Sequence, residues 1–223
     1  GFITDFVTYG TLETQLGTLI TDVNMKLPVG KVASYSGSIK TSGFNLGLFL
    51  DNTQLGHASF EGKVNGSGLN ARNLNAKLDG RIHLLEFNDY PYRDISVKGD
   101  VAKRLFNGQL VAKDPNLQAS MVGLIDFSKD IPLFNFDADV TVANLKNLKV
   151  IRDSIEFNGK FHVNFQGNNI DNFLGTARIF DASILKSGQR ISFDSLFLQS
   201  KMIDNNKIIT ALSNEFDAAL AGE

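Results

Sequence analysis

Apolar and polar residues alternate along most of the chain, which is the period-two pattern of β-strands that bury one face. The alternation is clearest at residues 74–84, 95–101, 117–127, 134–142 and 155–165. A typical strand has about 5–6 residues, so these longer runs favour a tall, curved sheet over a compact sandwich. Further on, Ile191 and Phe193 are out of phase with Leu196 and Leu198. That shift predicts a bulge or a turn between the two pairs.

Turn-forming residues interrupt the alternation at intervals typical of an antiparallel meander. The signals are Asn88-Asp89, Asn107-Gly108, Asp114-Pro115-Asn116, Asn158-Gly159, Ser187-Gly188 and Asn205-Asn206. Asn158-Gly159 falls inside an alternating run, where a bulge is the alternative to a turn. Helical periodicity is nearly absent. Only Leu46–Leu50 and Asn144–Leu148 are each compatible with a single helical turn.

The alternation gathers the larger apolar side chains on one face of the predicted strands. As residues that line this face we select Leu74, Leu78, Ile82, Ile95, Val97, Phe134, Phe136, Val140, Phe161, Val163 and Phe165. Two sheets packed as a sandwich would bury such a face, whereas a curved half-pipe would leave it lining a groove. The pattern alone does not separate the two arrangements.

The composition supports an all-β chain and removes several classes of function. Asp outnumbers Glu by 18 to 6, and the chain has 18 Phe but no Trp. Asp favours turns, Glu favours helices and aromatic residues favour strands. The net charge of −2 gives no reason to expect a nucleic-acid partner. The absence of cysteine excludes disulfides, thiolate metal sites and a cysteine nucleophile.

Candidate catalytic and metal-binding groups are few. The three histidines, among them His83 and His162 on the polar side of predicted strands, lack metal-ligand spacing. Asp137 and Asp139 share a strand face, but alternation alone places acids there, and we expect both to be solvated. Gly66-Ser67-Gly68 lacks the Lys and the helix of a phosphate-binding loop and is predicted to be a β-turn. We therefore predict no catalytic residue, no metal, no cofactor and no enzymatic activity.

The chain reads as an internal piece of a larger protein. No stretch reaches the roughly 20 apolar residues of a membrane span, and the first residues do not resemble a signal peptide. No linker or charge run marks a boundary, so we expect residues 1–223 to form one continuous domain. Apolar positions also align weakly at an offset of 101 residues, as any regular meander would allow.

Six segments, in their order and spacing, resemble the TamB/AsmA-like family of Gram-negative envelope proteins, especially TamB-type chains of Bacteroidetes. One segment is similar to the family pattern Asn-Gly-Tyr-x-Tyr-x-x-Ile: Tyr90-Pro91-Tyr92-Arg93-Asp94-Ile95 with Gly99. Here Asn88-Asp89 stands in place of the usual Asn-Gly. The other segments are 5–17; 43–47 with Leu55-Gly56; 114–117 leading to Gly123 and 126–128; 143–148; and 212–217 ending at Gly222. Together they cover nearly the whole chain.

The resemblance implies a β-taco, a long, mainly antiparallel sheet folded as a half-pipe with an apolar interior. It also implies a periplasmic section of a protein anchored in the inner membrane. The family roles are phospholipid transport between the two membranes, in which the groove shields acyl chains, and assembly of outer-membrane proteins with an Omp85-type barrel. The family has no catalytic residues to carry over.

Two other classes of function stay open at this point. One is a binding or adhesion module of a surface protein, built as a β-sandwich or a β-solenoid. The other, more distant, is a carbohydrate-active β-helix enzyme that uses acids such as Asp137 and Asp139.

Overall fold

The computed structural model describes residues 4–168, 172–204, 206–213 and 217–222. The chain divides into two compact units, Gly1–Pro115 (unit 1) and Asn116–Glu223 (unit 2), which we describe separately. That residues 1–223 form one continuous domain stays a prediction.

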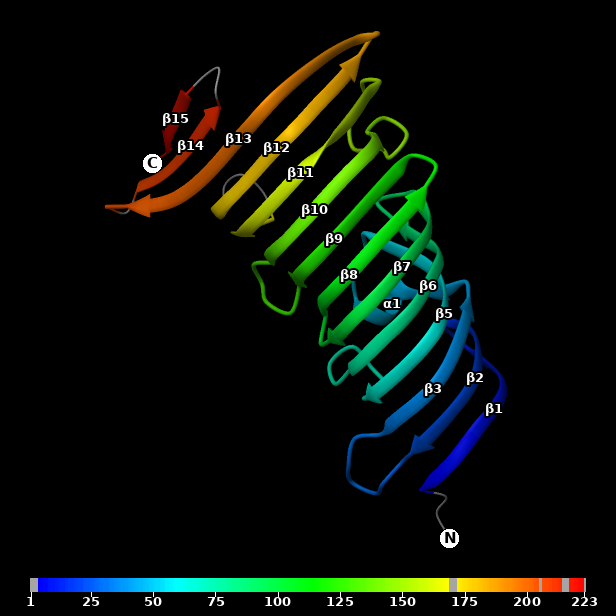
Figure 1. Cartoon of the computed structure of the whole chain (residues 1–223). Coiled ribbons are helices and arrows are strands. Elements are labelled where there is room, and N and C mark those ends of the chain that lie inside the picture. The colour runs from blue at the N-terminus through cyan, green and yellow to red at the C-terminus, as the bar shows by residue number, and fades with distance from the viewer. Residues whose placement is uncertain (1–3, 169–171, 205, 214–216, 223) are drawn as a thin grey trace. The chain divides into compact units, whose positions relative to one another are not determined.

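Unit 1 is a meander of long antiparallel strands with a single short helix (Figure 1). The strands pair in the order β1-β2-β3-β5-β6-β7-β8, and the short β4 adds to β5. The elements are β1 (Asp5–Thr14), β2 (Gly17–Lys26), β3 (Ser34–Ser42), β4 (Phe44–Asn45), α1 (Leu46–Leu50), β5 (Leu55–Ser67), β6 (Asn75–Phe87), β7 (Tyr90–Ala102) and β8 (Leu105–Asp114).

Unit 2 repeats this plan without a helix among its described residues. Its strands pair antiparallel in chain order, from β9 to β15. The strands are β9 (Leu117–Asp126), β10 (Leu133–Asn144), β11 (Ile155–Gln166), β12 (Leu174–Lys186), β13 (Gln189–Ile203), β14 (Asn206–Ser213) and β15 (Asp217–Gly222).

The all-β class and the long, open, antiparallel sheet are therefore confirmed. Within each unit the described strands belong to one sheet, and no second sheet packs on it. A sandwich of two facing sheets is thus not formed inside either unit. The antiparallel meander also differs from a β-solenoid or β-helix, whose successive coils pair in parallel.

Most of the predicted turns are found, and the exceptions have a local cause. Asn88-Asp89 and Ser187-Gly188 connect strands, with φ of 48°, 61°, 51° and 79°, as tight hairpin turns require. Asn107-Gly108 was wrongly predicted to be a turn, because it lies inside β8, where Gly108 pairs with Gly99. The hairpin turn is instead Lys103-Arg104, with φ values of 48° and 72°. These residues include no Asn or Gly that would have indicated a turn.

The remaining local predictions fall close to the sequence signals. Asp114-Pro115-Asn116 turns between strands, whereas Gly66 and Ser67 belong to the end of β5 rather than to a β-turn. Leu46–Leu50 is the predicted helical turn. The Leu148 amide donates to the Asn144 carbonyl over 3.0 Å, which closes one helical turn there too. Asn205, half of the last turn signal, lies outside the described residues.

Bulges keep the apolar face continuous where the sequence changes phase. On β10, the register shifts so that Val140 faces Gly159 and Ala143 faces Phe157. Gly159 and Phe157 are two residues apart and share a face, so Ala143 continues the apolar row. Val142, which simple alternation placed in that row, was therefore wrongly assigned.

A register shift of the same kind occurs on β6, where Ile82 pairs with Phe60 and Leu85 pairs with Ala58. Ala58 and Phe60 share a face of β5, so Leu85 replaces Leu84 on the apolar face. The predicted row of residues 74–84 is wrong at its last member.

A bulge in β12 produces the phase shift expected between Ile191 and Leu196. Phe157 pairs with Ile184 and so with Ile191, whereas Phe161 pairs with Ile179 and so with Leu196. The register between β11 and β12 shifts at Asn158, within the Asn158-Gly159 signal, and Asp181 has a φ of 50°. The predicted bulge or turn is therefore not found between Ile191 and Leu196 themselves: β13 runs unbroken in register with β12, and the irregularity lies in β12 opposite β11.

Candidate functional site

The apolar face of unit 1 carries four of the residues selected from the sequence: Leu78, Ile82, Ile95 and Val97. Ile82 pairs with Phe60 and Ile95, and Leu78 pairs with Val64 and Gly99. Leu74 immediately precedes β6 rather than belonging to it. The structure therefore brings these four together on adjacent strands, as alternation predicts.

The apolar face of unit 2 carries six others: Phe134, Phe136, Val140, Phe161, Val163 and Phe165. Phe136 pairs directly with Val163, so the faces of β10 and β11 converge as we expected. Four phenylalanine rings form a continuous row, one at or beside an end of each of β9, β10, β11 and β12. Their centroids are 5.7, 5.0 and 4.8 Å apart in the order Phe127, Phe134, Phe165 and Phe173.

Most of this face is only half-buried, which distinguishes it from a sealed core. Ile95, Val97 and Val163 are buried, whereas the other eight selected residues keep intermediate exposure. A second sheet would reduce apolar residues in the middle of long strands to near-zero exposure. Each unit thus presents an apolar surface that its own described residues cover incompletely.

Helix α1 crosses this face in unit 1. Phe44, whose partner Ala58 is on the apolar face, packs against Phe49 of α1 with ring centroids 5.6 Å apart. The Asn45 side chain caps the helix by accepting from the Leu48 amide at 2.8 Å, and Asp51 ends it with a φ of 54°. The guanidinium of Arg104 then donates to the Asp51 carbonyl over 3.2 Å.

That last hydrogen bond joins opposite ends of the strands. Arg104 follows β7, whose last residue pairs with Asn75 at the start of β6. The segment after α1 continues into Leu55, which pairs with Phe87 at the far end of β6. Thirteen strand residues span about 40 Å, whereas the four residues from Asp51 to Leu55 reach about 14 Å. The sheet of unit 1 must therefore curve around α1.

A buried polar cluster fastens one end of β7 to the end of β8. Asp114 is 1% exposed and accepts a hydrogen bond from the Tyr90 hydroxyl at 2.6 Å. Its other oxygen accepts from the Arg93 amide at 2.9 Å. Burial raises the pKa of the Tyr92 phenol, and the nearby charge of Asp114 raises that pKa further. Two of the segments that resemble the TamB/AsmA-like family thus meet in one contact.

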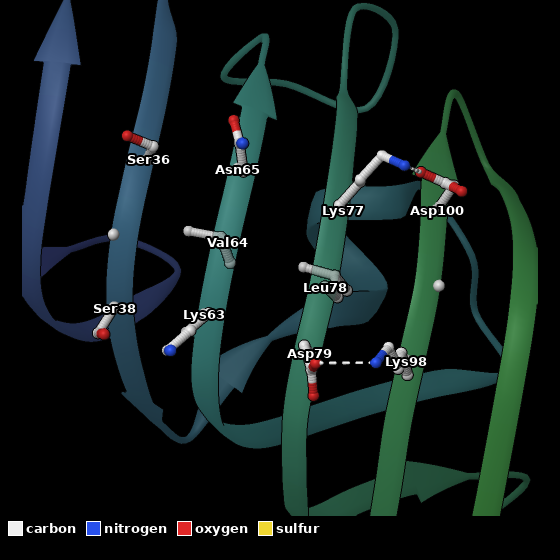
Figure 2. Close-up of a pocket in the computed structure, with 12 residues that line it drawn as sticks. Ser36, Ser38, Lys63, Val64, Asn65, Lys77, Leu78, Asp79, Lys98 and Asp100 are labelled. Atoms are coloured by element: carbon white, nitrogen blue, oxygen red, sulfur yellow. Dashed lines mark ion pairs between the residues drawn. The ribbon is translucent and has the colours of Figure 1, made fainter.

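The polar face of unit 1 contains a shallow depression of about 520 Å³ over β3, β5, β6 and β7 (Figure 2). Its walls include Lys63, Asp79 and Lys98, while the strand backbone supplies the floor. Lys98 pairs with Asp79 at 3.5 Å and Lys77 pairs with Asp100 at 3.6 Å. Because these charges pair with one another across neighbouring strands, the depression shows no concentrated charge for a ligand.

Asp137 and Asp139 lie on the polar face of β10, as predicted. Asp137 is exposed and contacts His162 at 2.7 Å. Asp139 pairs in register with Lys160, which contacts Asp181 at 2.9 Å. The pKa of Lys160 is raised, mainly by its hydrogen bond to Asp181 and to a smaller extent by the negative charge of that carboxylate. The two acids are thus parts of exposed cross-strand pairs.

Replacing both acids by amides, Asp137→Asn with Asp139→Asn, is expected to shift the thermal midpoint by less than about 2 °C, because exposed ion pairs contribute little to stability. Differential scanning calorimetry measures the shift. A glycoside hydrolase activity that disappears in the double variant would contradict our prediction that the chain is not an enzyme.

Within the described residues, the structure shows neither a metal-binding cluster nor a helix long and apolar enough to cross a membrane. No group of three or more His, Asp or Glu side chains there is placed to hold a metal ion. The described helix α1 is also far too short to cross a bilayer. His57 and His83 instead contact single carboxylates, those of Glu86 at 3.1 Å and Glu61 at 3.5 Å.

Comparison with known proteins adds no assignment, since no family model, curated protein or solved structure matches this chain.

Proposed function

We propose that the chain is a section of a hydrophobic groove that shields lipid acyl chains during phospholipid transport between two membranes. The observation that carries the proposal is the continuous, half-buried apolar face that each unit leaves incompletely covered. Such a face needs no reactive group, which agrees with the paired and solvated state of the acids and histidines.

The energetics favour a surface of this kind over a specific pocket. Removing one methylene group from water is worth about 0.8 kcal/mol, so a chain of about sixteen costs about 13 kcal/mol to expose. A row of Phe, Val, Leu and Ile side chains offsets most of that cost at every point along its length. Because the contacts are non-directional, the occupant is free to move along them.

The bulges support the same function. At Ile82, Val140 and Ile179, a strict alternation would have turned the following apolar residues to the polar face. An extra residue at each place keeps Leu85, Ala143 and Ala182 in the apolar row. An acyl chain that crosses successive strands would therefore meet apolar groups without interruption.

The cellular setting comes from the resemblance to the TamB/AsmA-like family. On that basis we place the section in the periplasm, within a longer protein anchored to the inner membrane. An Omp85-type outer-membrane barrel is the proposed partner of that longer protein, and assembly of outer-membrane proteins is its second proposed role.

Native mass spectrometry of chain purified from Gram-negative cells tests the proposal. We expect mass increments that correspond to bound phospholipid and that disappear after the lipid is extracted with detergent. A folded chain that carries no lipid, and that also fails to take up a fluorescent phospholipid, would contradict the groove and leave a binding or adhesion module as the better explanation.

A further inference from the structure

Three connections lie side by side at one edge of the sheet of unit 1. They are the β2–β3 loop (27–33), the β5–β6 loop (68–74) and the β7–β8 turn (103–104), which follow one another along that edge in Figure 1. Backbone hydrogen bonds join them, from the Gly68 amide to the Ala33 carbonyl and from the Lys103 amide to the Leu74 carbonyl. We call these connections the basic edge.

The basic edge carries positive charge with no acidic residue. Lys31, Arg72, Lys103 and Arg104 lie within it, and none of the four forms an ion pair with another described residue. At the opposite ends of the same strands, residues 43–54 and 88–89 contain Asp51 and Asp89 but no Lys or Arg. The two edges of unit 1 thus differ in the sign of their charge, although the whole chain is close to neutral.

Apolar side chains project from the same loops. Val29, Val32 and Leu69 are 78%, 52% and 56% exposed, although apolar residues are normally sparse at loop tips. Cations next to exposed apolar side chains are the combination that binds the interface of an anionic bilayer: cations meet phosphates, and apolar groups enter the headgroup region.

We propose that the basic edge docks on the surface of an anionic phospholipid membrane. An acidic protein would satisfy the cations, but it would leave Val29 and Leu69 without a matching environment. The proposal does not depend on lipid passing over the apolar face, because the cations and exposed apolar side chains of the basic edge lie in the connections between strands, whereas Leu78, Ile82 and Val97 lie on the strands.

Co-sedimentation with vesicles tests the docking. We expect the chain to bind vesicles of equal parts phosphatidylglycerol and phosphatidylcholine, and to bind phosphatidylcholine vesicles at least about tenfold more weakly. Each cation removed is expected to weaken binding about fivefold, so Lys31→Gln/Arg72→Gln/Lys103→Gln should weaken it roughly a hundredfold. Added salt should weaken the wild-type chain in the same direction.

A matched control removes the same charge elsewhere. Lys113, Lys129 and Arg152 are exposed, and each is adjacent in sequence to an aspartate. Lys113→Gln/Lys129→Gln/Arg152→Gln should leave binding within about twofold of the wild-type value. A separate variant, Val29→Asn/Leu69→Asn, keeps every charge and should reduce the binding that remains at high salt.

Far-ultraviolet circular dichroism establishes that each variant is folded. Equal binding to both vesicle types, equal loss in the two triple variants, or no binding by the wild-type chain would overturn the proposal. These outcomes are independent of the lipid content measured by native mass spectrometry, so either proposal can fail without the other.

Discussion

A photo-crosslinking side chain placed at Val140 is expected to form covalent adducts with phospholipid in cells, whereas the same side chain at Asp139 is expected to form none. Val140 is half-buried on the apolar face of β10, between Ala119 and Gly159. Asp139 lies on the other face, between Ser120 and Lys160. The adjacent positions differ in face but hardly in location, which makes them a matched pair.

The comparison needs a longer protein that retains its transport activity and a check that both labelled proteins are folded. Lipid adducts are identified by mass spectrometry after irradiation. Equal labelling at both positions, or labelling at neither in a folded protein, would contradict an acyl-chain groove. Leu78 and Lys77, adjacent positions on β6 of unit 1, supply an independent second pair.

Charged substitutions should follow the same geometry. Val140→Asp is expected to block lipid passage while the fold survives, because Val140 is only half-buried. Val163→Arg should also block passage, but Val163 is 5% exposed, so burying an unpaired charge there costs several kcal/mol and threatens folding. Val140→Asp is therefore the informative variant.

The second large effect concerns stability. Asp114→Ala is expected to lower the free energy of unfolding by about 3 kcal/mol, since it leaves the buried Tyr90 hydroxyl and the Arg93 amide without their acceptor. Tyr90→Phe removes only the donor and should cost about 1 kcal/mol. Urea titration followed by circular dichroism measures both values.

Asp126→Ala serves as the control for this measurement. Asp126 is also buried, but its side chain accepts a bond from the Ser128 amide within a local turn rather than holding two strands together. We expect a loss of about 1 kcal/mol there. If the Asp114→Ala variant is no less stable than Asp126→Ala, the hydrogen bonds of Asp114 to Tyr90 and Arg93 do not stabilise the pairing of β7 with β8.

The sequence predicted the class of fold because period-two alternation directly reflects which side chains face away from water. The ten selected residues that belong to strands share the apolar face of their unit, since alternation within a strand is a local property, while Leu74 lies just before β6. Leu84 and Val142 were misassigned because a bulge adds one residue, and its position depends on pairing with a neighbouring strand.

Features that depend on distant contacts were not predicted. Asp114 carries a turn signal in the sequence, yet its burial follows from the pairing of β7 with β8. The Lys103-Arg104 turn lacks Asn and Gly, and its conformation is imposed by the strands on either side. The basic edge is invisible along the chain, because its four cations are spread over 74 residues and meet only after the strands pair.

The hydrogen bond between Arg104 and Asp51 has a mechanical consequence. A single-layer sheet has little resistance to unrolling. Here the side chain of Arg104, at one edge of the sheet, links to the Asp51 carbonyl in the segment that comes from the opposite edge. The backbone, the paired strands and this hydrogen bond together complete a ring. An exposed hydrogen bond of this kind contributes only about 1 kcal/mol, so the ring opens easily and whatever lies on the apolar face beneath it can leave sideways as well as end-on.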